Sequence, residues 1–313
     1  MAGPEPLLLE LRDVRRQIRL GRKQSIHPVD GVSLTVARGE ILGLVGESGC
    51  GKSSLARLAA GLDRPTAGAV LLGGRPLWDA RDHVRARRVQ ILLQDPYSAL
   101  DPRMRVEAIV TEGLRIARRE RSRRAAELLA AVGLPSGAGA EFPHAFSGGQ
   151  RQRIGLARAL AVDPDLLVAD EPLSALDPSV QAQIANLLLD LRRRRGLGCL
   201  FISHDLAMVR HICDRVAVMY QGRLVELVPA CRLTSGALHP YTRGLLAALP
   251  NLDPRAARRQ PILPRGLPLP APTTGCPFAP RCPGVHDRCR VEMPAWREIE
   301  PGHWSACHDA LRR

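Results

Sequence analysis

The sequence is poor in aromatic residues and almost without lysine. Aromatic residues make up 3% of its 313 residues, and Lys23 and Lys52 are the only lysines among 45 basic residues. Its apolar runs all stop well short of the roughly 20 residues that span a bilayer. Its first residues, MAGPEPLLLELRD, lack the basic start and long apolar segment of a signal peptide. We therefore expect a cytosolic chain that reaches a membrane only through partner proteins.

The excess of arginine gives the chain a formal net charge of +14. Codon preference is the simplest reason for so many arginines, and it makes Lys52 informative. A lysine in such a chain indicates a site that needs a compact point charge rather than a planar fork. The basic run from Arg115 to Arg124 has no interleaved aromatic residues to stack on bases. It therefore predicts an exposed helix face and not a nucleic-acid contact.

The order of apolar segments predicts an α/β protein. Buried strands are expected at 41–45, 166–169 and 199–203, and a hairpin from 216–220 and 224–227. Helices are expected at 55–61, 103–134 and 180–195, the last capped by Asp177 with Pro178 in its first turn. Eight prolines between 261 and 283 follow a change of composition near residue 240. That change predicts a linker and a small C-terminal module.

A glycine-rich turn between the first apolar strand and its helix carries the strongest chemical signal. The turn fits the pattern G-x-x-x-x-G-K-[ST]. The residues of this pattern, together with the serine that follows it, are Gly46, Glu47, Ser48, Gly49, Cys50, Gly51, Lys52, Ser53 and Ser54. The glycines let successive backbone N–H groups surround phosphate oxygens at a helix N-terminus. Lys52 is expected to neutralise the β- and γ-phosphates, and the Ser53 hydroxyl to bind Mg²⁺.

Two acidic residues end the apolar strand LLVA. Asp170 is placed to hold Mg²⁺, mostly through water, and Glu171 to act as the general base that polarises an attacking water. An Asp-Glu pair after a strand is a weak signal alone, because a helix cap explains it equally well. Together with the phosphate loop it predicts a nucleoside triphosphatase.

A second anion-binding turn opens the helix IGLARALAV. Its residues are Ser147, Gly148, Gly149 and Gln150. One nucleotide does not need two such turns from one chain. We therefore expect the second turn to serve a nucleotide on another subunit, which makes the enzyme a dimer.

This combination resembles the ATP-binding subunits of ABC transporters over about residues 7–240, where SGGQRQR matches the signature motif. The resemblance implies that Gln94 contacts Mg²⁺ and signals to membrane subunits, that Ser174 to Asp177 form the D-loop, and that His204 contacts the γ-phosphate. It implies a P-loop NTPase fold of the ABC type within 1–240, with a mostly parallel core sheet, an antiparallel subdomain and a helical subdomain at about 95–160. Residues 241–313 would form an oligopeptide-transporter-type extension.

Within that family the sequence is most similar to the oligopeptide/dipeptide importer ATPases, which include nickel-importing relatives. The similarity lies in PVDGVSLTVARGE, QDPYSALDPR, HPYTRGLLAALP and the cysteine-containing tail. It implies an ATPase that energises peptide import, with ATP and Mg²⁺, at the cytoplasmic face of the plasma membrane. The implied partners are a second ATPase subunit, identical or paralogous, two membrane permeases and, indirectly, a substrate-binding protein. One departure is that Gln17 and Ile18 stand where an aromatic residue usually stacks on adenine.

Two other functions fit the same motifs. The net charge raises the alternative of a soluble ABC ATPase acting on nucleic acid, but only about 93 residues separate Ser54 from Ser147, too few for the long coiled-coil insertion of such proteins. An ABC exporter is the other alternative, and the importer-like segments argue against it.

Four of the eight cysteines lie in the tail: Cys276, Cys282, Cys289 and Cys307. Thiols or metal ligands are favoured over disulfides in a reducing compartment. The gaps of five, six and seventeen residues do not match the paired cysteines of a typical zinc site. The resemblance to peptide importers favours a [4Fe–4S] cluster, with zinc or no metal as alternatives. His303 and His308, which flank Cys307, are expected at the surface.

Overall fold

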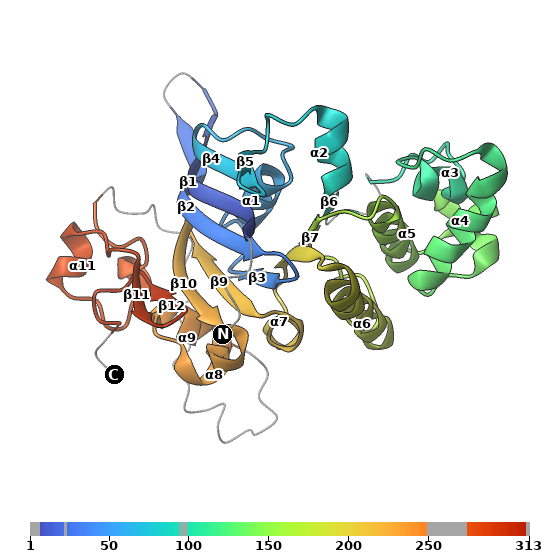
Figure 1. Ribbon diagram of the computed structural model, residues 1–313. Coiled ribbons are helices and arrows are strands. Elements are labelled where there is room, and N and C mark those ends of the chain that lie inside the picture. The colour runs from blue at the N-terminus through green and yellow to red at the C-terminus, as the bar shows by residue number, and fades with distance from the viewer. Residues whose placement is uncertain (1–6, 22–23, 94, 96–98, 249–273, 311–313) are drawn as a thin grey trace, which may run out of the picture.

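Two β-sheets frame the computed structural model, which describes residues 7–21, 24–93, 95, 99–248 and 274–310 (Figure 1). The larger sheet has eight strands in the order β11-β12-β10-β9-β3-β8-β7-β6. In chain order these are β3 (Ile41–Val45), β6 (Val89–Leu92), β7 (Leu166–Asp170), β8 (Gly198–Ile202), β9 (Arg215–Tyr220), β10 (Arg223–Pro229), β11 (Arg297–Glu300) and β12 (His303–Ser305).

Five neighbouring strands of this sheet, from β9 to β6, run parallel. Strands β3, β7 and β8 are buried at every position, which explains their continuous apolar sequences. Because parallel strands end at one edge of the sheet, the segments that follow β3, β7 and β8 meet there. This edge brings the phosphate loop, the two acidic residues and His204 together.

The smaller sheet is antiparallel and is formed by the N-terminal part of the chain. Its order is β2-β1-β4-β5, formed by β1 (Leu7–Arg19), β2 (Ser25–Ala37), β4 (Ala67–Leu72) and β5 (Arg75–Pro76). Its buried side chains share one hydrophobic cluster with the helix after the phosphate loop, α1 (Lys52–Ala59). The antiparallel subdomain expected from the resemblance is therefore confirmed.

The remaining helices lie around the parallel strands or project from them. They are α2 (Asp82–Arg88), α3 (Val106–Thr111), α4 (Arg118–Ala131), α5 (Gly148–Ala161), α6 (Pro178–Arg195), α7 (Leu206–Ile212), α8 (Leu233–Gly236), α9 (Pro240–Ala247) and α11 (Asp287–Val291). Figure 1 shows α3 and α4 at one end of the molecule and α11 at the other. The Asp177 side chain accepts hydrogen bonds from the first turn of α6, as predicted, and Gly196 ends that helix.

The helical segment expected over 103–134 is interrupted, because it forms α3 and α4 with a break between them. Gly113 lies in the break, where a Cβ would come 2.6 Å from the Val162 side chain, so the chain turns at a residue without one. The arginines of α4 are exposed or half-buried, and Arg123 and Arg124 both pair with Glu127. The basic run is thus a solvated helix face.

The described part of the C-terminal segment joins the main sheet. Strand β12 pairs with β10, and β11 pairs with β12. Phe278, Cys276 and Cys289 belong to the same hydrophobic cluster as the parallel strands. The division of the chain near residue 240 stays a prediction, but its two parts share one sheet and one core. Among the described residues, no helix is long and apolar enough to cross a membrane.

Candidate functional site

The phosphate loop curves from the end of β3 into α1 beside a cavity of about 380 Å³. Helix α1 begins after Gly51 without a side-chain cap, which leaves the N–H groups of its first turn for a ligand. The Lys52 ammonium donates to the carbonyl oxygens of Gly46 (2.8 Å) and Glu47 (3.0 Å). These bonds hold the Lys52 ammonium against its own loop. Phosphate oxygens of a bound nucleotide can replace the two carbonyl oxygens as acceptors.

Two positions of the phosphate loop favour glycine, each for a different reason. Gly51 has φ 109°, and a Cβ there would lie 1.9 Å from the Pro28 carbonyl oxygen. Gly49 has φ 78°, but a Cβ there would have no neighbouring atom within 4 Å, so only its backbone conformation favours glycine. The loop therefore packs tightly against strand β2 at one end and faces open space in its middle, where a phosphate would lie.

Asp170 and Ser53 both line this cavity. The Ser53 hydroxyl lies near enough to the Asp170 carboxylate to influence its pKa. Burial raises the pKa of the Asp170 carboxyl, while the Ser53 hydroxyl and the Lys52 charge oppose that rise. A hydroxyl and a carboxylate are oxygen ligands of the kind that Mg²⁺ prefers, so these two residues fit a magnesium ion that also binds phosphate.

Glu171 and His204 form a pair at the same cavity. His204 Nδ1 lies 2.7 Å from Glu171 Oε2. The Glu171 side chain is 11% exposed and that of His204 is 71% exposed. Glu171 adopts φ 53°, a left-handed conformation that is uncommon without glycine, and its carbonyl accepts a 2.8 Å bond from the Gln152 side chain. The base candidate is thus buried and held by its carbonyl, whereas the histidine is mostly exposed.

The signature turn forms a second, separate hollow. Ser147 caps α5 through a capping box with Gln150, with its hydroxyl accepting from the Gln150 N–H at 3.3 Å. The turn lines a cavity of about 300 Å³ with Ala175, Leu176 and Asp177. This cavity shares no lining residue with the one at the phosphate loop. Within one chain the two turns therefore serve different spaces.

The structure gathers most of the predicted ATP-site residues into the first cavity. Its lining includes Gly46, Ser48, Gly49, Gly51, Lys52, Ser53, Ser54, Asp170, Glu171 and His204. Glu47 and Cys50 point elsewhere, and Gln17 and Ile18 do not line it. Gln94 lies outside the described residues.

Sequence reasoning missed three residues that hold this site. Gln152 bonds the Glu171 carbonyl, Tyr241 accepts the Glu47 N–H at 2.8 Å, and Arg281 pairs with the Glu47 carboxylate. Gln152 lies inside the signature motif, two residues after Gln150, so its position was the one available signal. Nothing in the sequence marks Tyr241 or Arg281, which come from distant segments.

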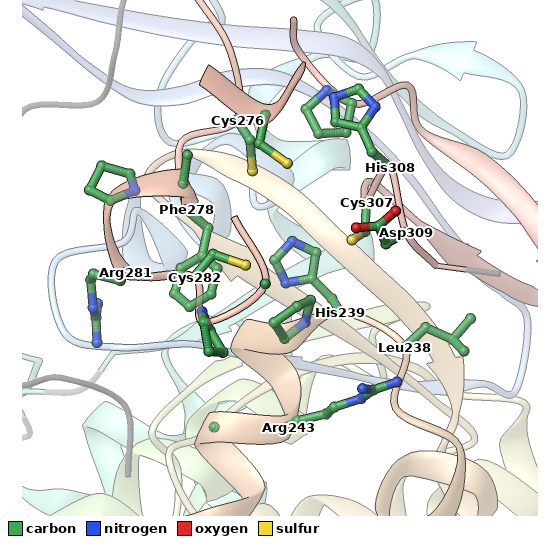
Figure 2. A pocket seen from close by; sticks show the side chains of 18 residues that line it. Leu238, His239, Arg243, Cys276, Phe278, Arg281, Cys282, Cys307, His308 and Asp309 are labelled. Carbon is green, nitrogen blue, oxygen red and sulfur yellow. The ribbon is translucent and has the colours of Figure 1, made fainter. Parts of the chain in front are cut away.

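The four tail cysteines line one cavity of about 510 Å³ together with His239, His308 and Asp309 (Figure 2). All four are free thiols. Burial raises the pKa of Cys276 to about 11 and also raises the pKa values of Cys282 and Cys307. In the part of the chain that the structure describes, no three His, Cys, Asp or Glu residues are arranged to hold a metal ion. The cluster expected there is therefore not confirmed.

The surface position expected for His303 was wrong. His303 is 1% exposed, and its Nε2 lies 2.7 Å from Glu226 Oε1. The same carboxylate accepts the N–H groups of Leu238 (2.7 Å) and His239 (3.1 Å). Glu226 therefore connects β10, β12 and the start of α9 inside the protein.

Two family models and several known ATP-binding proteins match this chain. The family described as "ABC transporter" matches residues 29–174, and the one described as "Oligopeptide/dipeptide transporter, C-terminal region" matches residues 225–289. The chain is 47% identical over 311 residues to a "Putative peptide import ATP-binding protein" of Brucella ovis, covering 97% of this chain and 98% of the relative. It is 45% identical over 326 residues to the "Oligopeptide transport ATP-binding protein AppF" of Bacillus subtilis, covering 98% of each.

A solved structure shares the cassette. It is the dimeric post-hydrolysis state of an ATP-binding cassette bound to ADP and Pi, with a TM-score of 0.66 and 27% identity over 71% of this chain and 99% of that chain. Fold and site together define an ATP-hydrolysing cassette of the P-loop class. The chain belongs to the ABC transporter family, among the ATP-binding subunits whose C-terminal region is of the oligopeptide/dipeptide transporter type.

Proposed function

We propose that this chain hydrolyses ATP at its phosphate loop to energise the import of peptides through an ABC transporter. The observation that carries the proposal is the single cavity that unites Lys52, Ser53, Asp170, Glu171 and His204. The C-terminal match and the relatives' names support di- or oligopeptides, or related compounds, as cargo.

The geometry suggests how each side chain acts. Lys52 leaves the carbonyls of its loop for the β- and γ-phosphates of ATP. Ser53 and Asp170, which line the cavity, would hold Mg²⁺, and Gln94 would join them as the resemblance to the family implies; the ion would supply positive charge at the phosphate oxygens. Glu171 accepts a proton from water as the water oxygen bonds to the γ-phosphorus and the bond to the bridging oxygen breaks. His204 turns from Glu171 to contact the γ-phosphate.

A dimer completes the site, because the signature turn opens on a different space from the phosphate loop. In our proposal, Ser147 and Gly149 of one subunit contact the nucleotide on the other, which is a copy or a paralogue. The pair works on two membrane permeases, peripherally at the cytoplasmic face, and indirectly with a substrate-binding protein. Closure around ATP excludes water and strengthens the electrostatic contacts with the phosphates.

The test compares Glu171→Gln with Glu141→Gln, an exposed glutamate that lies away from both cavities. In the assembled transporter, Glu171→Gln should keep ATP binding and lose about 10²–10⁴-fold in turnover, because the amide cannot accept a proton. Glu141→Gln should match the wild type. Lys52→Arg should also lose activity, since a planar cation replaces a point charge. Normal turnover in Glu171→Gln would refute the assignment.

The thiol cavity supports a second proposal, that Cys276, Cys282, Cys289 and Cys307 hold a [4Fe–4S] cluster. Four thiols line one cavity of about 510 Å³, and thiolates are the ligands of such clusters. Because the thiols are not arranged to hold a metal ion in this structure, they would have to draw together on binding. Burial raises the pKa values of Cys276, Cys282 and Cys307, so binding of the cluster would have to supply the free energy of their deprotonation.

Anaerobic purification should give a brown protein with iron and sulfide. Cys289→Ser should remove the colour and keep ATP binding, whereas the exposed Cys231→Ser should keep both. A colourless anaerobic protein with one zinc per chain would show that the metal is zinc instead.

A further inference from the structure

All three polar groups of Glu47 in the phosphate loop are engaged, two of them by the C-terminal extension. The Glu47 N–H donates to the Tyr241 hydroxyl at 2.8 Å, and its carbonyl accepts from Lys52 at 3.0 Å. Its carboxylate accepts two bonds from Arg281, at 2.7 and 2.8 Å. Parallel bonds between a guanidinium and a carboxylate fix direction as well as distance. The extension thus holds Glu47, the second residue of the loop, in place through these hydrogen bonds.

Arg281 is itself held in place, which makes it a firm anchor. Its side chain is 11% exposed, and its guanidinium lies 5.8 Å from the Tyr220 ring centre and 5.9 Å from that of Phe278. The charge of Arg281 also opposes the burial that raises the pKa of the Tyr220 hydroxyl. Tyr220, Tyr241 and Phe278 pack on one another with ring centres 4.7 to 5.5 Å apart. This aromatic cluster joins β9 to two parts of the extension, α9 and the segment that carries Phe278 and Arg281.

The contacts of the extension gain importance when ATP binds. To reach the phosphates, Lys52 must give up its bonds to the Gly46 and Glu47 carbonyls. Once it does so, Tyr241 and Arg281 are the groups among the described residues that still hold Glu47 by side-chain hydrogen bonds. A loop already fixed in its binding shape loses less conformational entropy when the ligand arrives.

We propose that Arg281 and Tyr241 are positioning residues of the phosphate loop, through which the C-terminal extension sets the affinity for ATP. This inference rests on the proposed ATP site. Arg281 directly precedes Cys282, a residue of the thiol cavity, so a change of that segment reaches the loop through one peptide unit and one ion pair. The competing explanation is that the pair only fastens the extension to the cassette.

Binding and turnover measured on the same variants separate the two explanations. Arg281→Gln and Glu47→Gln should each raise the Kd and the KM for ATP about tenfold, a usual size for coupling between two sites. The kcat at saturating ATP should change less than about twofold. The double variant should match either single one, because both remove the same interaction. Arg288→Gln is the matched control, since it breaks an exposed pair with Glu292 in the same extension.

Three outcomes decide the proposal. An unchanged Kd for ATP in a folded Arg281→Gln, or additive effects in the double variant, would overturn it. If Arg281→Gln does not fold, Tyr241→Phe removes one hydroxyl and keeps the ring, and an unchanged Kd there would also overturn it. Lys52→Ala separates this test from the proposed function. If Lys52→Ala still binds and hydrolyses ATP normally, the ATP site itself is wrongly assigned.

Discussion

His239 should make the stability of the protein fall in mild acid. Its imidazole is 1% exposed, and its Nδ1 accepts the Tyr241 N–H at 3.1 Å, so α9 is capped by the neutral ring. Burial lowers the pKa of His239 from 6.5 to about 4, with Arg243 acting in the same direction and Glu226 against it. A proton therefore binds the unfolded chain more readily than the folded one.

The sign and size of the effect follow from that pKa difference. The contribution of the neutral His239 ring to the free energy of unfolding is complete above pH 6.5. It is lost as the pH falls from 6.5 towards 4. One pKa unit corresponds to about 1.4 kcal/mol, so the full loss is about 3 kcal/mol. Between pH 7.5 and pH 5 the free energy of unfolding should fall by about 2 kcal/mol from this residue alone.

Urea unfolding at several pH values measures this loss. Trp296 and Trp304, which stack in the extension, supply a fluorescence signal. His239→Asn keeps a side-chain acceptor for the helix cap but does not titrate. Its stability should therefore lose about 2 kcal/mol less than the wild type over that pH range. His83→Asn, which changes an exposed histidine, should behave as the wild type. Equal pH dependence in His239→Asn and the wild type would refute the reasoning.

Three further predictions concern other parts of the chain. Gly51→Ala should abolish ATP binding or folding, because its Cβ would lie 1.9 Å from a backbone oxygen. Gly49→Ala should cost only about 1 kcal/mol of backbone strain. Calorimetry and ATP titration measure both effects. Ser147→Ala should lower thermal stability by about 1 kcal/mol through the lost cap of α5 and should weaken ATP-dependent dimerisation, measured by size-exclusion chromatography. Exposed Cys231 should react first with a thiol reagent, whereas Cys199, whose pKa is raised to about 12 by burial, should react only after unfolding, as mass spectrometry would reveal.

The sequence could predict those parts of the site that are encoded by short local motifs. The phosphate loop, Asp170 and Glu171 each follow an apolar strand, and parallel strands bring such ends together without further information. The hairpin of β9 and β10 was equally readable, because Gln221 and Gly222 separate two apolar runs. The fold class followed from the same alternation of strands and helices.

The contacts made by single residues across long stretches of chain could not be predicted. Arg281 lies 234 positions from Glu47, and nothing distinguishes it from the many other arginines. His303 was misplaced because its partner lies 77 positions away, in the run 224–227 of β10. Its glutamate, Glu226, was the available signal, since a carboxylate inside a buried strand requires a hydrogen-bonding partner.

The pairing of β12 with β10 has a consequence for the synthesis of the chain and for any truncated form of it. During synthesis β10 emerges long before β12, so until residues 303–305 are available its outer edge offers unpaired N–H and C=O groups. The same edge would be bare in a fragment ending near residue 240, and Glu226 would be left without His303. Such a fragment should aggregate by adding foreign strands to β10. A nascent chain would face the same hazard, and would benefit from a chaperone that covers this edge until translation ends.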